Sequence, residues 1–174
     1  MLHSQGLAFL QNGEAPEAQR LADDIKTLVE DSVSLRLVRY ADHLLGMKEL
    51  QAKNYRLAVS HLEKAVAGLY APEPNFPTLQ PLFFSTLAEA YLEAGELDKA
   101  AQYFKKVLNM ALGRHQAGDI YARCFYGLAR VFDQKGEIKQ AKEQYQHFLN
   151  LWEGGDPGLP GVAEARERLQ ALNR

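Results

Sequence analysis

The sequence lacks the features that mark secreted, membrane-embedded or nucleic-acid-binding proteins. Its 174 residues include a single cysteine, Cys124, so no internal disulfide can form. No apolar run approaches the roughly 18 residues that a membrane-spanning helix needs. Basic and acidic side chains number 20 and 22, and no basic stripe that would attract nucleic acid is visible. The first residues show no basic leader or cleavage site. We therefore expect a cytoplasmic protein with no nucleic-acid or membrane partner.

β-branched residues are also scarce, and no stretch sustains the alternation of apolar and polar residues that a half-buried strand shows. The residues that are abundant are Ala, Leu, Glu, Gln and Lys, all good helix formers. The composition therefore predicts an all-α fold with almost no sheet.

Residues that could support catalysis or bind a metal are few and scattered. No two of the five histidines share one helical turn, and none lies near the cysteine: they are His3, His43, His61, His115 and His147. A phosphate-binding glycine loop is absent. Glu89 and Glu93 are one helical turn apart, but an exposed helix face explains them better than an acid–base pair does. We expect no enzymatic activity, no metal and no cofactor.

A short phrase recurs along the chain at nearly constant spacing. It reads NGEAPEA, AKNYRLA, AGELDKA and KGEIKQA, and its closing alanines are Ala18, Ala58, Ala100 and Ala141. These alanines are 40, 42 and 41 residues apart. A fixed spacing with a recurring local pattern indicates a repeat protein.

Small and aromatic residues keep the same register around these alanines. The third unit has Phe84, Ala88, Tyr91, Gly95 and Phe104, and the fourth has Phe125, Ala129, Phe132, Gly136 and Tyr145. The second unit differs, because Asp42 and Glu49 stand at the aromatic positions. Two antiparallel helices cross closely only where one surface is small, and bulky aromatic side chains fill the space beside that crossing.

This pattern resembles the tetratricopeptide repeat, W-x₂-L-G-x₂-Y…A-x₃-F…P, with Phe in place of the Trp and no closing Pro. The resemblance covers most of the chain, up to about residue 152. It implies a right-handed superhelix of antiparallel helix pairs that is closed by a C-terminal capping helix. The units of about 40–42 residues exceed the 34 of a standard repeat. They are similar to those of kinesin light chains, of sensor arrays in bacterial transcription activators and, most of all, of C-terminal arrays in bacterial signalling proteins.

We divide the single domain, 1–174, into four units and a cap. The units span about 1–33, 34–72, 78–116 and 119–152, and the capping helix spans 160–172. Expected helices are 2–11, 14–30, 34–51, 55–69, 80–93, 96–112, 119–134 and 137–152, with 70–81 and 153–161 as interruptions. Gly95 and Gly136 are expected to end a helix in a left-handed conformation, and Asn54 to do so in the second unit. The excess length predicts an extra turn on both flanking helices.

The resemblance implies that the first helix of each pair lines a concave groove. Its expected partner-binding residues are Tyr40, His43, Met47, Glu89, Glu93, Arg123, Tyr126 and Arg130, with Leu44, Gln51, Ser85, Thr86 and Asp133 beside them. Two simpler interpretations stay open. Glu89 and Arg130 could pair across neighbouring units, and His43 could be packed or solvated. The signs of charge are mixed, which does not suit a strongly charged ligand.

The favoured function is a non-catalytic scaffold that holds a peptide or protein segment in this groove. The first alternative is a sensory or regulatory segment of a larger bacterial signalling protein. The second is self-association, because the first unit is short and the N-terminal edge has no capping helix. That edge predicts either a longer parent array or stacking on a second copy.

Overall fold

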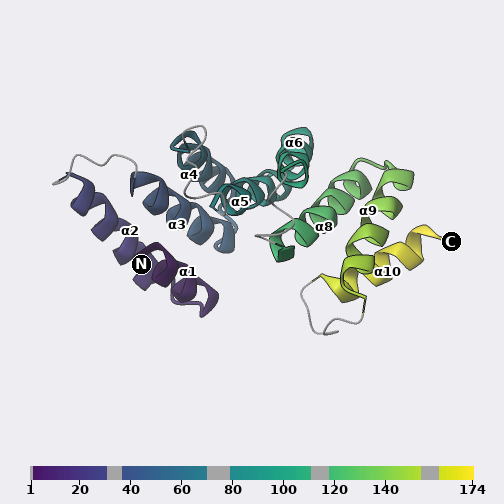
Figure 1. The fold of residues 1–174 in the computed structure, drawn as a ribbon, viewed down its shortest axis with the longest axis horizontal. Coiled ribbons are helices and arrows are strands. Elements are labelled where there is room, and N and C mark those ends of the chain that lie inside the picture. Colours follow the sequence, from purple (N-terminus) through teal and green to yellow (C-terminus); the bar gives the residue numbers. More distant parts are fainter. Residues whose placement is uncertain (1, 31–36, 70–78, 111–117, 154–160) are drawn as a thin grey trace.

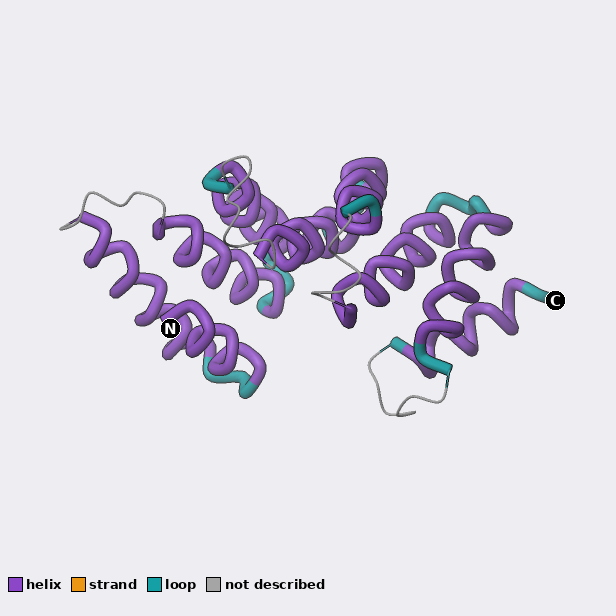
Figure 2. Tube along the Cα trace, viewed as in Figure 1, coloured by secondary structure: helices purple, strands orange, loops and turns teal. Residues whose placement is uncertain are grey.

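The computed structural model describes residues 2–30, 37–69, 79–110, 118–153 and 161–174. In these ranges the chain forms nine helices and no strand, which confirms the predicted all-α class (Figure 2). The helices are α1 (Leu2–Gln11), α2 (Ala15–Glu30), α3 (Val38–Gln51), α4 (Tyr55–Ala67), α5 (Leu79–Glu93), α6 (Leu97–Leu108), α8 (Gly118–Gln134), α9 (Ile138–Leu151) and α10 (Val162–Leu172).

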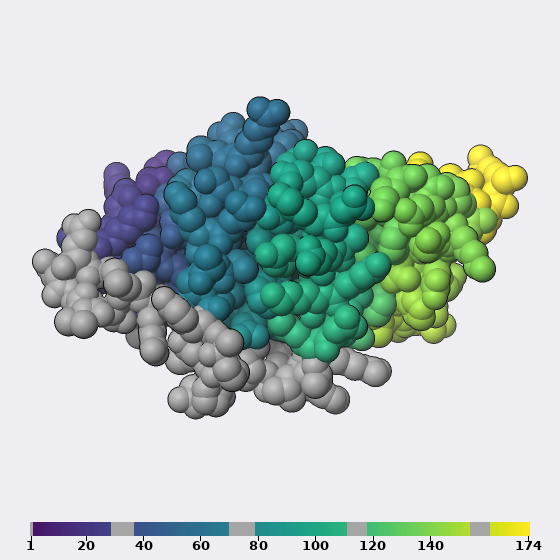
Figure 3. Space-filling view, turned by 90° about the horizontal axis from the view of Figure 1, so that it is seen from above, coloured from purple at the N-terminus to yellow at the C-terminus, as the bar shows by residue number. Residues whose placement is uncertain are grey.

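The helices follow one another along the longest axis of the molecule. Figure 1 shows an arch with α1 and α2 at one end and α9 and α10 at the other. Helices α4, α6 and α9 lie on its outer side, and α3, α5 and α8 lie on its inner side. In Figure 3 successive units occupy successive bands of colour, as expected of a helical repeat in which each unit contacts only its neighbours. The handedness of a superhelix stays a prediction.

Most helix boundaries lie within a few residues of the predicted ones, but the end of α6 does not. The expected helix 96–112 ends at Leu108, where the Met110 amide donates to the Val107 carbonyl at 3.1 Å and tightens the last turn. The predicted extra turn is therefore wrong for α6, which has 12 residues, whereas α8 has 17. Predictions for 34–36, 70–78, 111–112 and 154–160 lie outside the described residues, and the unit boundaries stay predictions.

All four helix pairs turn in the same way, five residues before the closing alanine. The residue there has a positive φ: 80° at Gly13, 79° at Gly95 and 73° at Gly136. In each turn the next amide donates to the carbonyl five residues back, at 2.8–2.9 Å. The second unit corrects our prediction, because Lys53 takes the positive φ of 61° and Asn54 has φ −84°. The position in the repeat, and not the residue type, determines where the chain reverses.

Small residues mark the points where helices cross closely. The closing alanines of the four units are at most 1% exposed. A Cβ atom added at Gly46 would collide with the Leu62 side chain, and one added at Gly127 would collide with the Phe104 ring. Glycine at these two positions therefore allows a bulky side chain of the neighbouring helix to lie against the backbone.

The buried apolar side chains form two clusters instead of one continuous core. The smaller consists of Leu10, Ala18, Ala22, Ile25, Ala41, Leu44 and Leu45. The larger extends from Ala58 in α4 to Ala165 in α10 and includes most of the aromatic residues that carry the repeat pattern. All buried polar or charged side chains among the described residues belong to α3, namely Arg39, Asp42, His43 and Glu49. Helix α3 thus contributes a polar layer where the two clusters meet.

The last helix covers the end of the array, as predicted. Val162 and Ala165 of α10 are buried against the larger cluster, and Leu169 and Leu172 are partly buried against it. Arg168 of α10 donates to both oxygens of Asp133 in α8 at 2.8 Å. The other face of α10 is charged and exposed. One apolar face inward and one polar face outward is what the end of a helical repeat needs.

Candidate binding groove

A cavity of about 410 Å³ opens on the inner side of the arch. Its walls come from α1, α3, α5 and α8, with one ring from α6 and the residue that precedes α10. The lining residues are Leu7, Gln11, Met47, Leu50, Leu82, Ser85, Thr86, Glu89, Phe104, Ile120, Arg123, Cys124, Tyr126 and Gly161. The volume lies in the range of sites that take a small ligand or a few side chains of a peptide.

The cavity brings together half of the eight predicted binding residues. Met47, Glu89, Arg123 and Tyr126 line it, together with two neighbouring hydroxyl side chains of α5. The other four, Tyr40, His43, Glu93 and Arg130, are not in its lining. Of the further residues expected nearby, Leu44 is 1% exposed in the smaller apolar cluster, Gln51 donates to the Leu10 carbonyl, and Asp133 is engaged by Arg168.

His43 lies beneath the groove surface and offers nothing to a partner. Its side chain is fully buried and its ring stacks on Phe83, with ring centroids 4.2 Å apart. The Thr86 hydroxyl donates to a backbone carbonyl at 2.8 Å and lies 3.3 Å from His43 Nε2. His43 Nε2 therefore donates to Thr86, and its Nδ1 accepts from His3 Nε2 at 3.2 Å. Burial lowers the pKa of both imidazoles, that of His3 to about 4.

Tyr40 belongs to the same group of rings. Its ring centroid lies 4.9 Å from that of His3 and 6.1 Å, edge-on, from that of Phe83. These contacts join α1, α3 and α5 on the inner side of the arch. Tyr40 and His43 therefore support the wall of the groove from behind.

Arg130 links two neighbouring units through a pair of carboxylates. Its Nη1 donates to Glu89 Oε1 at 2.6 Å and its Nη2 to Glu93 Oε1 at 2.5 Å. The side chains of Arg130, Glu89 and Glu93 are 22%, 38% and 29% exposed, so the cluster is only partly hydrated. Burial raises the pKa of Glu89, and the guanidinium opposes that rise. Burial also acts to lower the pKa of Arg130, but the two carboxylates outweigh it and raise that pKa.

The C-terminal wall of the groove is formed by α8. Tyr126 lies under the start of α10, where a Cβ atom at Gly161 would come 3.1 Å from its ring. Burial, reinforced by the Glu164 carboxylate, raises the pKa of the Tyr126 hydroxyl, which stays a neutral hydrogen-bonding group. Arg123 is more open: its side chain is 59% exposed and pairs with Asp119, one turn earlier, at 2.9 Å.

The sequence interpretation missed the apolar part of the lining. Leu7, Leu50, Leu82 and Ile120 are partly exposed in the cavity. Phe104 and Cys124 form its buried floor, and burial raises the pKa of the Cys124 thiol to about 12. Leu50, Leu82 and Ile120 lie one helical turn from predicted groove positions, whereas Leu7 lies on α1 and Phe104 on the second helix of a pair. A helical projection of each unit, extended by one turn, would have found Leu50 and Leu82.

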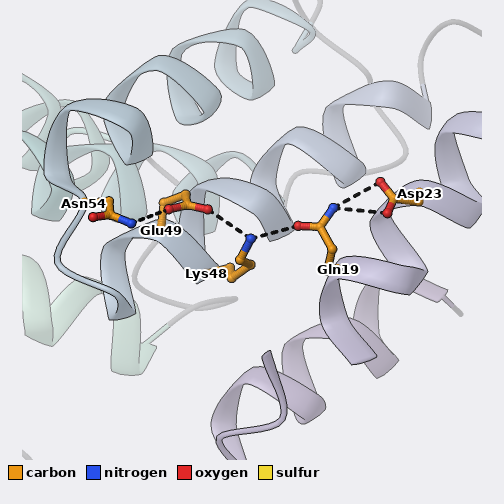
Figure 4. A network of polar contacts seen from close by, with 5 residues as sticks. All are labelled: Gln19, Asp23, Lys48, Glu49 and Asn54. Atoms are coloured by element: carbon orange, nitrogen blue, oxygen red, sulfur yellow. Dashed lines mark hydrogen bonds and ion pairs between the residues drawn. The ribbon is translucent and has the colours of Figure 1, made fainter. Parts of the chain in front are cut away.

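A separate polar network ties α2 to α3 on another side of the molecule (Figure 4). Gln19 receives a bond from Lys48 Nζ at 2.9 Å and donates to both oxygens of Asp23. Lys48 also lies 3.0 Å from Glu49, which accepts from the Asn54 amide at 2.8 Å. None of these five residues lines the cavity, so the network stabilises the contact between the first two units.

The N-terminal edge exposes mostly small and polar side chains, with Leu28 of α2, 55% exposed, as its large apolar one. In α1 the exposed positions are Ser4, Gln5, Ala8 and Gln11, and those of α2 include Arg20, Asp23 and Asp24. In the part of the chain that the structure describes, no group of three or more His, Cys, Asp or Glu side chains could hold a metal ion. No described helix combines the length and apolarity that crossing a bilayer requires.

Comparison with known proteins agrees with this geometry. Residues 84–154 match the family profile described as tetratricopeptide repeat, a class of repeat that generally mediates contacts between proteins. The transcription activator GutR of Bacillus subtilis (strain 168) is 24% identical over 163 residues, which is 92% of this chain. The chain spans only 18% of the length of that relative. The profile match over residues 84–154 and the stacked helix pairs together support an assignment of the chain to the tetratricopeptide repeat family.

Proposed function

We propose that the chain is a non-catalytic scaffold that binds a short segment of a partner protein in the groove between α1, α3, α5 and α8. The observation that carries this proposal is the cavity itself. It combines four partly exposed aliphatic side chains with the polar groups of Gln11, Ser85, Thr86, Glu89 and Arg123. Apolar walls with a few convergent polar groups are typical of binding sites.

The surroundings of the cavity support the proposal because they are closely packed and bridged by hydrogen bonds. Its floor, Phe104 and Cys124, belongs to the larger apolar cluster, and its wall is supported by the His43–Phe83 stack. The Arg130 bridge holds α5 and α8 at a fixed distance. A surface that is already ordered loses little entropy when a segment binds, so a modest contact area suffices for affinity.

A second candidate is a regulatory segment of a larger bacterial protein. The similarity to the transcription activator GutR favours it, because that relative is much longer than this chain. In such a protein, occupation of the groove would be the signal that the rest of the chain transmits. Both candidates use the same groove, and they differ in what is attached to it.

A substitution that fills the groove tests the proposal. Peptides are selected from a random display library on the immobilised full chain, and one selected peptide is synthesised with a fluorescent label. Ser85→Tyr would place a ring in the cavity, because Ser85 lines it and only donates to the Leu82 carbonyl of its own helix. We expect this variant to weaken peptide binding, measured by fluorescence anisotropy, by at least about tenfold, or 1.4 kcal/mol.

The matched control is Ser60→Tyr, the same substitution at an exposed position of α4 on the outer side of the arch. It should leave the affinity unchanged. If both variants bind the peptide as the parent chain does, or if both lose it equally, the groove is not the binding surface.

A further inference from the structure

The charges of this molecule are divided between its two sides. Helices α4, α6 and α9 on the outer side carry seven Lys and Arg against three Asp and Glu. Helices α3, α5 and α8 on the inner side carry four against six. The overall formal charge of −2 hides this division. Of these six helices, the three inner ones therefore carry an excess of acidic residues and the three outer ones an excess of basic residues.

The excess negative charge of the inner side is concentrated on α5. That helix contains Glu89 and Glu93 and no basic residue. Arg130 neutralises one of the two charges, so the bridge as a whole keeps one negative charge. Arg123, the other cation of the lining, already pairs with Asp119 and adds no net charge. The middle of the groove therefore has a net negative charge beside an apolar wall.

The bridge also has hydrogen-bonding capacity left for an incoming cation. Each bond from Arg130 uses Oε1 of its carboxylate, whereas an ionised carboxylate can accept several bonds. Because Glu89 is only partly hydrated, with 38% of its side chain exposed, a second cation beside it would be screened less than at a fully open surface.

We propose that the groove selects segments in which a lysine or arginine side chain is flanked by apolar side chains. The basic group would lie against Glu89, which lines the cavity, with Glu93 one helical turn away, and the apolar side chains would contact Leu50, Leu82 and Ile120. This inference rests on the proposed function, and it names the chemistry of the partner. Acidic segments are excluded by the same net charge.

The peptides selected on the full chain test this inference directly. We expect lysine or arginine next to apolar residues to be enriched over the starting library. The selected peptide should lose about fivefold in affinity for Glu93→Gln, and more for Glu89→Gln with Glu93→Gln, as expected for a partly buried charge pair. Replacing the basic residue of the peptide by Gln should cause a similar loss, and the two losses should not add.

The single Glu93→Gln variant leaves the Arg130–Glu89 pair in place, so it separates loss of charge from loss of folding. Glu143→Gln, at an exposed position of α9, is the control that removes one negative charge elsewhere. Enrichment of acidic residues, or of no charge at all, would overturn the inference. So would full affinity for both glutamine variants. If Ser85→Tyr still blocks binding in that case, the scaffold proposal stands and only the charge selection fails.

One further experiment distinguishes a groove that binds a peptide segment from one that binds only a small amine. If the binding of a selected peptide is competed by a single apolar amine such as hexylamine as effectively as by the unlabelled peptide, the groove recognises a small cation and the segment proposal is wrong. We expect the amine to compete at least about a hundredfold more weakly, because it lacks the additional contacts of the segment.

Discussion

The second and third helix pairs use different chemistry at matching positions of the repeat. In the third pair Phe84 of α5 faces Tyr103 of α6, with ring centroids 5.9 Å apart. In the second pair the same two positions hold Asp42 and His61, whose Oδ1 and Nδ1 atoms are 3.7 Å apart. The backbone arrangement is the same, but an aromatic contact has been replaced by a polar one.

A second position repeats this contrast. Tyr91 of α5 is buried and its hydroxyl donates to Glu63 of α4 at 2.5 Å. Its counterpart in α3 is Glu49, which accepts from the Asn54 side chain and lies beside Lys48. Hydrogen bonds from Asn54 and then from Lys48 hold the pKa of Glu49 below its ordinary value.

This contrast indicates which part of the molecule should unfold first. Apolar contacts depend little on pH or salt, whereas buried polar groups stabilise a fold only while each keeps its partner. Because the polar layer of α3 lies between the two apolar clusters, we expect α1–α3 to open before α5–α9 does. Stability that is unevenly distributed along the chain is characteristic of repeat proteins.

The largest expected effect comes from truncating the same core position in both pairs. Leu87→Ala should lower the free energy of unfolding by about 4 kcal/mol and Leu45→Ala by about 3 kcal/mol, since the two side chains are 0% and 6% exposed. Urea denaturation followed by circular dichroism measures the loss. Hydrogen exchange should show that Leu87→Ala exposes α5–α9 and that Leu45→Ala exposes α1–α3, because the two side chains belong to different apolar clusters.

Leu57→Ala, on α4 between the two regions, is the control, because its side chain is 48% exposed. It should change stability by less than about 0.5 kcal/mol. If the two core variants gave the same exchange pattern over the whole chain, the two clusters would form one cooperative unit and our comparison would fail.

Acidification should discriminate between the two regions next. Folding lowers the pKa of His3 from 6.5 to about 4, and that of His43 also falls well below its ordinary value. Between these values the unfolded chain binds more protons, so stability is complete above pH 6.5 and falls as the pH drops toward 4. A shift of this size corresponds to roughly 3 kcal/mol for His3 alone. Exchange measured against pH should show α1–α3 losing protection before α8 and α9.

The variant His43→Gln tests the source of this dependence, because an amide can keep a hydrogen bond without titrating. This variant should be less stable than the parent chain near neutral pH, but its free energy of unfolding should fall less on acidification. His147→Gln, which changes an exposed imidazole, is the control and should leave the pH profile unaltered. An identical acid response in all three proteins would exclude the buried histidines as its cause.

The sequence predicts the architecture well because the repeat signal lies in residues that are neighbours along the chain. The spacing of the closing alanines, the glycines that end the first helices and the apolar face of α10 are all local patterns, and the structure agrees with them. The burial of His43 could not be predicted, because it depends on His3 and Phe83, each about 40 residues away in sequence. The predicted lining of the groove was incomplete for a similar reason. Leu82 and Phe104 look like core residues until their neighbours are placed.

Exchanging the chemistry of the two pairs is expected to have a smaller effect. The double variant Asp42→Phe with His61→Tyr would copy the Phe84–Tyr103 contact into the second pair. We expect it to raise the free energy of unfolding by about 1 kcal/mol, because a polar pair replaced by apolar groups of suitable shape is often neutral or stabilising. The melting temperature at two salt concentrations measures the gain. The single variant Asp42→Phe should be destabilising, since His61 would face a ring without its polar partner.

The smallest effect concerns the turns that both pairs share. Lys53 and Gly95 occupy the same position, with φ of 61° and 79°. A side chain in the left-handed region costs roughly 1 kcal/mol, so Lys53→Gly should gain up to about 0.5 kcal/mol once the greater freedom of glycine in the unfolded chain is subtracted. By the same balance Gly95→Lys should lose about 0.5 kcal/mol, since no atom lies within 4 Å of an added Cβ and only the backbone conformation opposes it. Equal and opposite shifts in urea midpoint would show that the two turns are interchangeable. If Lys53→Gly instead lowered the stability, the Lys53 side chain would itself stabilise the second pair, and the two turns would not be interchangeable.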